Sequence, residues 1–394
     1  MQTTLLIYGL LFCGAWIAIY AYLMRATKVL PLFHQQEFSE PQQWPHLSVI
    51  VPACNEAEHI EAAAKSLIEQ DYPNLEIILV NDRSQDNTGE IIERLATSNP
   101  QVKAVHIETL PDNWLGKVHA LHQGQQVASG EWLLFTDADI HYAPGLLRRA
   151  VSYVLTHQVD QLALLPRVIL HSFWLQVAIR TFGLLFFLTT RAPSITQPES
   201  KAVIGIGAFN LVRRDTVART PGFEWLRMDT VDDMGVGLLI SNAGGRTHFA
   251  RADNDLSVTW YASIAGMFRG LEKNLFGPGA NYRLSKLITQ VGLIWALVAA
   301  PFISIFSSSP WLIAAAVLVF VMYLTFSVFF VREKQSETLS LLLFPVGLLL
   351  LSMMMLWAGF QCIMNNGIEW RGTHYSCLLY TSPSPRDLLS HRVG

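Results

Sequence analysis

The sequence predicts an α/β protein with a mostly parallel sheet, flanked by transmembrane helices at both ends of the chain. From residue 47 to residue 135, short apolar stretches suited to strands alternate with stretches of helical periodicity, which indicates βαβ units. The 394 residues are 51% hydrophobic and only 15% charged, against roughly 25% charged in a typical soluble domain. This deficit is concentrated at the two ends, so the middle is expected to be the water-soluble part.

The expected elements follow one another in strict alternation. Strands are predicted at 47–51, 76–80, 102–107 and 132–135, and helices at 55–68, 88–96 and 116–128. Pro52 is expected to end the first strand, and Asn55 to cap the helix after it.

Charge and cysteine content argue against several classes of function. The net charge is −3 and no block of basic residues occurs, so no nucleic-acid partner is expected. The four cysteines show no paired spacing, which predicts neither a disulfide framework nor a zinc site. No G-x-G-x-x-G follows the first strand, and the chain has no G-x-x-x-x-G-K-[ST] loop, so neither a dinucleotide cofactor nor a P-loop nucleotide site is predicted.

The first apolar segment, residues 5–24, carries no charge and is long enough to cross a bilayer. Arg25 and Lys28 follow it, the reverse of the order in a cleaved signal peptide. We therefore expect an uncleaved anchor, with the basic residues and the middle domain in the cytoplasm of a cell with a bacterial-type inner membrane.

Three further spans are expected at 288–306, 311–331 and 339–362. The basic residues beside the first two again favour a cytoplasmic middle domain; they are Arg283, Lys286, Arg332 and Lys334. Pro345 and Gly347 interrupt the last segment, so a re-entrant hairpin is an alternative, and the side of the C-terminus stays open.

Residues 173–190 form another apolar segment, with Arg180 in its middle. A full span would bury that charge, so we expect a helix lying at the membrane surface that helps to bring a lipid to the site. The alternative is a core helix of the middle domain.

Two acids, Asp137 and Asp139, follow the strand at 132–135. Open α/β sheets place their ligands beyond the carboxyl ends of strands, and paired carboxylates there suit Mg²⁺ or Mn²⁺ shared with substrate phosphates. The alternative is a capped turn with one solvated acid. The loops at 51–56 and 80–84 are predicted to reach the same edge, where an acid such as Asp82 suits a nucleotide.

Four ordered motifs resemble those of the family-2 glycosyltransferases of the GT-A fold, over roughly residues 47–280. They are Val51-Pro-x-x-Asn-Glu56, Val80-x-Asp-x-Ser84, Gly116-Lys117-x-x-Ala120-Leu121 and Thr136-Asp-Ala-Asp139. The apolar ends, with Leu110-Pro-x-x-Trp114 and Ile368-x-Trp-Arg-Gly-Thr-x-Tyr375, resemble membrane members that glycosylate lipids, such as ceramide glucosyltransferase and the hopanoid-associated enzymes.

The resemblance implies a nucleotide diphosphate sugar as donor, with a UDP-sugar expected first. The implied nucleotide-sugar contacts are Pro52, Asn55, Glu56, Asp82, Lys117, Asp137 and Arg269. Asp137 and Asp139 would bind the metal. Asp233 would be the general base toward the acceptor hydroxyl, with Asp232 in support. The alternative is that these two acids cap a helix at 234–242.

The sequence also departs from the family pattern. Processive polysaccharide synthases carry Gln-x-x-Arg-Trp near residue 270, where this chain has Phe268-Arg-Gly-Leu-Glu-Lys-Asn274. This difference makes a processive enzyme less favoured. Residues 376–394 have no pattern continuous with the rest and are interpreted as a non-native tail.

The resulting prediction divides the chain into an anchor (1–28), a linker (29–46), a cytoplasmic GT-A domain (47–287), a transmembrane region (288–375) and the tail. The predicted activity is inverting, metal-dependent transfer of a sugar to a membrane lipid. The alternatives are a polysaccharide or polyprenyl-phosphate sugar synthase, an inactive nucleotide-sugar-binding membrane protein, and part of a transporter.

Overall fold

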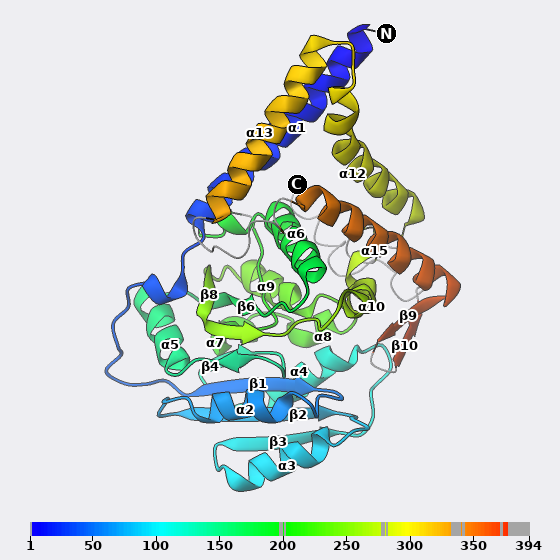
Figure 1. Ribbon diagram of the computed structural model, residues 1–394. Coiled ribbons are helices and arrows are strands. Elements are labelled where there is room, and N and C mark those ends of the chain that lie inside the picture. Colours follow the sequence, from blue (N-terminus) through cyan, green and yellow to red (C-terminus); the bar gives the residue numbers. More distant parts are fainter. Residues whose placement is uncertain are drawn as a thin grey trace. The chain divides into compact units, whose positions relative to one another are not determined.

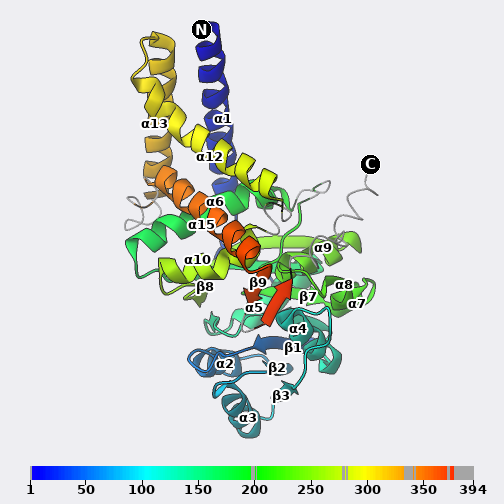
Figure 2. The same cartoon turned by 90° about the vertical axis from the view of Figure 1, so that its right-hand side faces the viewer.

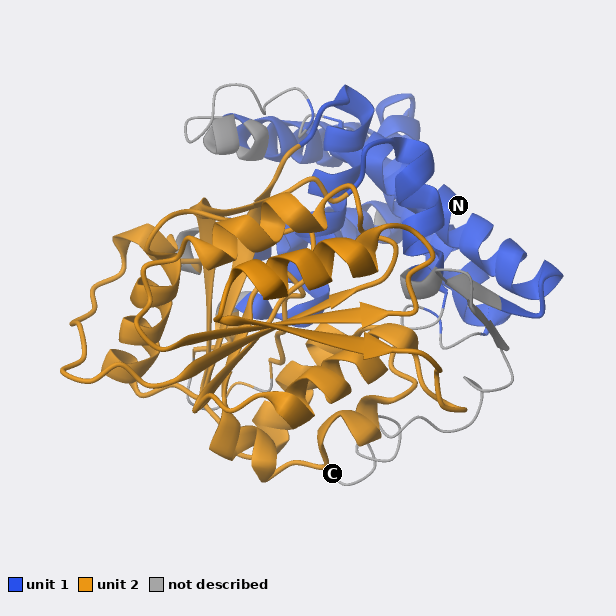
Figure 3. Ribbon diagram, turned by 90° about the horizontal axis from the view of Figure 1, so that it is seen from below, with its two compact units in different colours: residues 1–29, 170–193, 261–382 blue, residues 30–169, 194–260, 383–394 orange. Residues whose placement is uncertain are grey.

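The computed structural model describes residues 2–196, 200, 202–276, 280, 283–331, 340, 343–370 and 373–376. These residues divide into two compact units, coloured separately in Figure 3. Unit 1 takes its described residues from 2–29, 170–193 and 261–376, and unit 2 from 30–169 and 194–260. Residues 170–193 and 261–287, which the sequence places within the middle domain, therefore group with the apolar helices.

Unit 2 is built on an eight-stranded sheet of order β3-β2-β1-β4-β7-β6-β8-β5 (Figure 1). The strands are β1 (Leu47–Ala53), β2 (Leu75–Asp82), β3 (Val102–Ile107), β4 (Trp132–Phe135), β5 (His141–Tyr142), β6 (Gln161–Val168), β7 (Asn210–Arg213) and β8 (Thr247–Val258). Strands β3, β2, β1 and β4 are mutually parallel, as are β6 and β8, whereas β7 runs antiparallel between β4 and β6. The predicted mostly parallel α/β sheet is confirmed, and the antiparallel β7 within it was not predicted.

The longer helices of unit 2 are α2 (Ile60–Ile68), α3 (Thr88–Ser98), α4 (Gly116–Val127), α5 (Leu146–His157) and α9 (Asp232–Asn242), and the short ones are α7 (Arg214–Ala218) and α8 (Gly222–Leu226). Helix α4 packs on β1 and β2 and needs a glycine to do so. A Cβ at Gly124 would lie 2.5 Å from Ile50 Cγ2, so the helix approaches the sheet at this residue.

Two local predictions at the end of β1 are wrong. The strand passes through Pro52, which pairs with Val80 of β2. On the other side, the ladder of β1 with β4 stops at Ile50, whose carbonyl accepts from Thr136 N. The missing N–H of Pro52 faces that vacated side, so the proline costs no ladder hydrogen bond. Asn55 does not cap α2: it has a φ of 54°, and the residue preceding the helix is His59.

Unit 1 consists of helices and one hairpin. They are α1 (Gln2–Val29), α6 (Phe173–Thr190), α10 (Ile264–Leu275), α12 (Leu284–Ile305), α13 (Pro310–Val331), α15 (Phe344–Met364), β9 (Gly367–Trp370) and β10 (Thr373–Ser376). Helix α1 lies along α13, and α15 packs against α6, α10 and α12 (Figures 1 and 2).

Within the described residues, four helices are long and apolar enough to cross a membrane: Ile7–Arg25, Phe173–Thr190, Leu284–Ile305 and Phe344–Met364. The stretch Pro310–Thr325 of α13 is a shorter apolar segment. In the described part of the last segment, Phe344–Met364 is one continuous helix that Pro345 and Gly347 do not interrupt, because Pro345 falls in its first turn, where a proline is tolerated. Gly347 lies directly against Thr181 of α6. Arg332, Lys334 and the tail from residue 377 lie outside the described residues.

Helix α6 has the predicted bounds, and the side chain of Arg180 within it donates a hydrogen bond to Ser340 Oγ. The guanidinium therefore has a polar partner inside unit 1. Whether α6 spans a bilayer or lies on its surface stays a prediction.

Candidate active site

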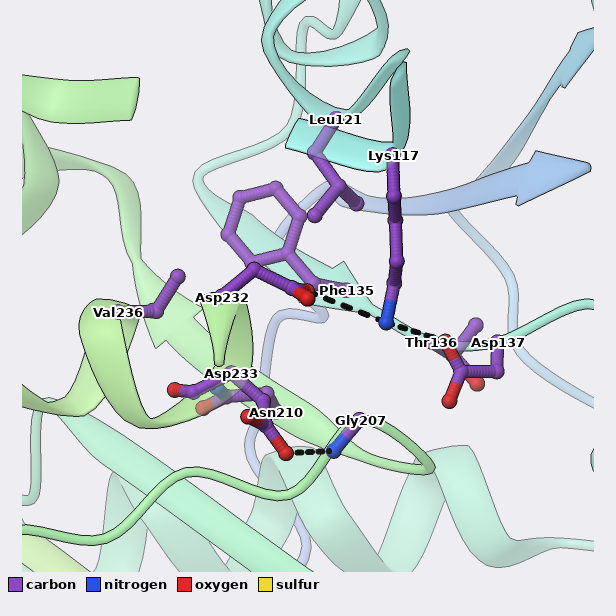
Figure 4. A pocket seen from close by; sticks show the side chains of 10 residues that line it. All are labelled: Lys117, Leu121, Phe135, Thr136, Asp137, Gly207, Asn210, Asp232, Asp233 and Val236. Carbon is purple, nitrogen blue, oxygen red and sulfur yellow. Dashed lines mark hydrogen bonds and ion pairs between the residues drawn. The ribbon is translucent and has the colours of Figure 1, made fainter. Parts of the chain in front are cut away.

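A pocket of unit 2 gathers charged side chains at the carboxyl end of β4 (Figure 4). Its walls come from α4, the end of β4, the loop before β7, β7 itself and the first turn of α9. The lining residues are Lys117, Leu121, Phe135, Thr136, Asp137, Gly207, Asn210, Asp232, Asp233 and Val236. The structure thus brings together four of the predicted site residues: Lys117, Asp137, Asp232 and Asp233.

Lys117 bridges two of these acids (Figure 4). It lies in the first turn of α4, and its Nζ is 2.7 Å from Asp137 Oδ1 and 3.1 Å from Asp232 Oδ2. Desolvation opposes the charge on this lysine, but Asp137 and Asp232 outweigh it and raise the pKa of Lys117 above its ordinary value. The ammonium is therefore a fixed positive charge between the two acids.

Asp233 is held by two backbone N–H groups. Its Oδ2 accepts from Gly207 N at 3.1 Å, and its Oδ1 accepts from Met234 N at 2.8 Å. Desolvation, with repulsion from Asp232, raises the pKa of Asp233 to about 6, although Lys117 opposes the shift. A carboxylate tuned in this way can take up and release a proton near neutral pH.

The alternative, that the two acids precede and cap a helix at 234–242, is wrong about where the helix begins. Helix α9 begins at Asp232, and the residue before it is Val231, so both acids lie in the first turn. Carboxylates in that turn still interact favourably with the free N–H groups of the helix end. A stabilising role and a chemical role are therefore compatible here.

The loop before β7, which contains Gly205 and Gly207 and is called the glycine loop below, connects Asp137 to Asp233. Gly207 donates its N–H to Asp233 Oδ2, and its carbonyl accepts from Asp137 N at 3.0 Å. A Cβ at Gly207 would lie 2.7 Å from Asp137 Oδ2, and one at Gly205 would collide with the carbonyl of Asp233. Only glycine fits at Gly205, where the neighbour is backbone, whereas a side chain at Gly207 would require the Asp137 carboxylate to move.

Asp139 and Asp137 suit the divalent metal that the family resemblance implies. Desolvation, together with the charges of Asp137 and Glu56, raises the pKa of Asp139 to about 7, so negative charge is crowded here. The ammonium of Lys117 already lies against Asp137, which shows that a positive charge fits. No group of three or more His, Cys, Asp or Glu side chains suited to a metal occurs among the described residues. The chain would thus supply two carboxylates and leave the remaining ligands to substrate and water, as is common for Mg²⁺.

The predicted nucleotide contacts of the first two loops do not line this pocket. Asp82 is buried and forms an ion pair with Arg83, with Nε 2.7 Å from Oδ1. Asn55 ties the two loops together, since its N–H donates to Ser84 Oγ and its Oδ1 accepts from Gln85 N. Glu56 N donates to Thr88 Oγ1 at 2.8 Å, and Pro52 is buried within β1. These contacts join the loops after β1 and β2 into one corner of unit 2, and Asp82 reaches the start of α4, where a Cβ at Gly116 would collide with its carboxylate.

Arg269 is exposed on α10 of unit 1. Its contact with a donor stays a prediction.

Asn210 lines the pocket and is 1% exposed, but it is not among the predicted site residues. The available signal was a lone amide at the start of the apolar strand Asn210-Leu-Val-Arg213, directly after the glycine loop. A polar residue at a buried strand position needs a partner, which is reason to examine it.

Comparison with known proteins extends the resemblance. Residues 48–218 match the family model described as Glycosyl transferase family 2. The chain is 33% identical over 114 residues to the uncharacterized glycosyltransferase YibD of Escherichia coli (strain K12), which covers 29% of this chain and 32% of the relative. It is 38% identical over 101 residues to the poly-beta-1,6-N-acetyl-D-glucosamine synthase of Staphylococcus epidermidis, covering 26% of this chain and 23% of the relative. The matched stretch thus spans about a third or less of these relatives.

Among solved structures, the chain resembles the mannosyltransferase PcManGT from Pyrobaculum calidifontis in complex with GDP-Man and Mn²⁺. The TM-score is 0.56 at 21% sequence identity, over 90% of this chain and 99% of that chain. This likeness shows the fold. The family match covers the chain from β1 to α7, and with it the strands and loops that build most of the pocket, and the likeness to the mannosyltransferase shows a GT-A-like fold.

Proposed function

We propose that this protein is an inverting, metal-dependent glycosyltransferase that moves a sugar from a nucleotide diphosphate sugar to a hydroxyl group of a membrane lipid. The observation that carries the proposal is Asp233, a carboxylate with a pKa of about 6, in one pocket with Lys117 and Asp137. A general base works best when its pKa lies near the operating pH.

The proposed reaction is a single displacement. Asp233 takes the proton of the acceptor hydroxyl while the oxygen forms a bond to the anomeric carbon of the sugar. The bond from that carbon to the nucleotide diphosphate breaks, and its electron pair leaves with the diphosphate. Asp233 ends the step protonated, and the configuration at the anomeric carbon is inverted.

Lys117 is the proposed contact for the leaving diphosphate, because its ammonium is held in the pocket by the two acids it bridges. Asp137 and Asp139 would hold Mg²⁺ or Mn²⁺, which when bound supplies positive charge to the departing diphosphate. Mn²⁺ accompanies GDP-Man in the structurally similar mannosyltransferase.

The nucleoside would lie in the corner built by the loops after β1 and β2. The proposed contacts there are Pro52, Asn55, Glu56 and Asp82. Asn55 and Ser84 join the two loops, so this corner is organised by the chain itself before any donor binds. We expect a UDP-sugar, and Arg269 of α10 as a further contact to the diphosphate.

The apolar helices of unit 1 support attachment to a membrane and therefore a lipid acceptor. With the middle domain in the cytoplasm, the uncharged link after α12 would lie on the outer face. In a cysteine-free background, Ser308→Cys should react with an impermeant thiol reagent in intact cells, and Glu58→Cys only after lysis. The reverse pattern would remove the cytoplasmic supply of donor.

The direct experiment uses purified protein in vesicles made from the lipids of the expressing cells. Radiolabelled UDP-glucose, UDP-N-acetylglucosamine and GDP-mannose are each supplied with Mg²⁺ or Mn²⁺. We expect one donor to yield a labelled lipid that carries a single sugar. If no donor is consumed, while binding of UDP or GDP is retained, the inactive nucleotide-sugar-binding protein is the better description.

A second candidate is a polysaccharide or polyprenyl-phosphate sugar synthase. The likeness to the poly-beta-1,6-N-acetyl-D-glucosamine synthase over 101 residues favours a polymer product. Size analysis of the same reaction identifies a polysaccharide, because a polymer stays near the origin in thin-layer separation while a lipid with one sugar migrates with the solvent. A polyprenyl-phosphate sugar would also migrate, but mild acid would release its sugar.

A further inference from the structure

Three polar residues, each the first of its strand, are joined by hydrogen bonds across three neighbouring strands. Gln161 is the first residue of β6, Asn210 of β7 and Thr247 of β8. These strands are adjacent in the order β7-β6-β8, and Gln161 is paired with Thr247 in the ladder. Gln161 is 0% exposed and Asn210 1% exposed, so both amides must find their partners inside the protein.

The hydrogen bonds between these residues run in one direction. Thr247 Oγ1 donates to Gln161 Oε1 at 2.8 Å, and Gln161 Nε2 donates to Asn210 Oδ1 at 2.7 Å. Asn210 Nδ2 in turn donates to the carbonyl oxygen of Asp233 at 3.4 Å. The hydroxyl of Thr247 thus orients the Gln161 amide, and Gln161 orients the Asn210 amide.

The two amides hold two different segments of the site. Gln161 Nε2 also donates to the carbonyl of Ile204, at 3.1 Å, in the loop before β7. Asn210 holds the carbonyl of Asp233, in the first turn of α9. One pair of side chains therefore fixes the glycine loop and the start of the helix relative to each other.

Loop and helix meet without intervening side chains. A Cβ at Gly205 would collide with the carbonyl of Asp233, and a Cβ at Gly237 would collide with the carbonyl of Ile204. Two residues further along the loop, Gly207 N donates to Asp233 Oδ2, and the carbonyl of Gly207 accepts from Asp137 N. A small shift of the loop against α9 would therefore move the carboxylate of Asp233 relative to Asp137.

We propose that Thr247, Gln161 and Asn210 form a positioning relay for the base Asp233, and this inference rests on the proposed function. None of the three takes part in the chemistry. The relay holds the 204–207 loop and the first turn of α9 in register, and so sets the place of the carboxylate that accepts the proton.

The rate of a displacement reaction depends strongly on the positions of the reacting groups. A displacement of the reacting groups by about 1 Å can cost roughly 10²-fold in rate. For stability alone, apolar residues of the same shape can replace a buried hydrogen-bonded pair with little loss. A buried relay that leads from an outer hydroxyl to the backbone of the base is thus better explained by placement of the base than by stability.

The first test compares Asn210→Leu with the control Ser48→Ala. Ser48 is equally buried and hydrogen-bonded, to Glu76 and Gly130, but it lies in β1 away from the pocket. Asn210→Leu should lower kcat at least tenfold, with the Kd for UDP (or for GDP, if GDP-mannose is the donor) changed less than twofold. Ser48→Ala should leave kcat unchanged. An Asn210→Leu variant with wild-type kcat would overturn the relay.

A double variant separates this inference from the proposed function. Because the relay acts through Asp233, Asn210→Leu should change kcat less than twofold when Asp233→Asn is already present. If Asp233→Asn alone were as active as the wild type, the assignment of the base would fail. If Asp233→Asn were impaired and Asn210→Leu lowered kcat equally in both backgrounds, the base would stand and the relay would be wrong.

If Asn210→Leu fails to fold or to bind nucleotide, Thr247→Val is used to test the relay. It removes only the outer hydroxyl, which does not line the pocket. We expect kcat to fall about three- to tenfold with an unchanged Kd for UDP or GDP. A kcat equal to that of the wild type would overturn the relay.

Discussion

Glu76 and Asp233 are two carboxylates at opposite ends of the same sheet, and their surroundings differ. Glu76 lies at the amino end of β2 and is 6% exposed. It accepts hydrogen bonds from Lys103, from Ser48 Oγ, and from the N–H and hydroxyl of Ser129. Burial opposes its ionisation, but these donors outweigh burial and lower the pKa of Glu76 to about 2.

Asp233 lies near the carboxyl end of β4 and accepts from two backbone N–H groups, with Asp232 beside it. Desolvation and the charge of Asp232 raise its pKa to about 6. Glu76 is therefore always charged near neutral pH and stabilises the fold, whereas Asp233 can exchange a proton there, as the proposed base must.

The largest effect on activity is expected for the two acids that are proposed to bind the metal. Asp137→Asn or Asp139→Asn should reduce transfer roughly 10³-fold or more, since each would remove a proposed ligand of the metal that is expected to stabilise the leaving group by several kcal/mol. The melting temperature should stay within a few degrees of the wild type. Turnover is measured in lipid vesicles with and without a chelator, and full activity of either variant in metal-free vesicles would contradict the assignment.

A smaller effect is expected at the neighbour of the base. Asp232→Asn should lower kcat by roughly tenfold, the effect of losing one charged hydrogen bond, because Asp232 holds Lys117 but accepts no proton. Steady-state kinetics compare it with Asp233→Asn under the same conditions. A loss at Asp232 larger than that at Asp233 would exchange the two roles.

The change expected to leave catalysis intact is Glu76→Gln. It should lower the free energy of unfolding by roughly 1–3 kcal/mol, because several buried donors lose a charged acceptor, and kcat should stay within twofold of wild type. The pKa of Glu76 is lowered on folding, so its stabilisation is present above about pH 4.5 and is lost as pH falls toward 2. Denaturant unfolding at pH 7 and at pH 3 should therefore show a smaller difference between variant and wild type at pH 3.

Much of the fold could be predicted because its signals are local. The strands at Val102–Ile107 and Trp132–Phe135 have the predicted bounds, since an apolar β-prone run between turn residues specifies them. Strand β7 could not be predicted in its place, because insertion of an antiparallel strand between β4 and β6 depends on long-range pairing. Asn55 was misassigned for a related reason: its partners, Ser84 and Gln85, lie on another loop.

The candidate site likewise contains residues that could be predicted from the sequence and residues that could not. Lys117 and Asp137 belong to the ordered motifs, Asp232 and Asp233 were implied by the family resemblance, and the structure brings all four into one pocket. Their roles in the reaction stay predictions. Gln161 gave no signal in the sequence, because a single glutamine at the start of a strand carries no motif and its two acceptors come from distant segments.

The pH dependence of turnover in the wild type and in Asp233→Asn tests the central claim most directly. If Asp233 is the base, it must be unprotonated, so kcat/KM of the wild type should fall as pH decreases through about 6. Asp233→Asn should lower kcat by roughly 10²–10⁴-fold, the range for loss of a general base, and should abolish this acidic limb. Retention of wild-type turnover in Asp233→Asn, or an acidic limb that the substitution leaves unchanged, would contradict the account.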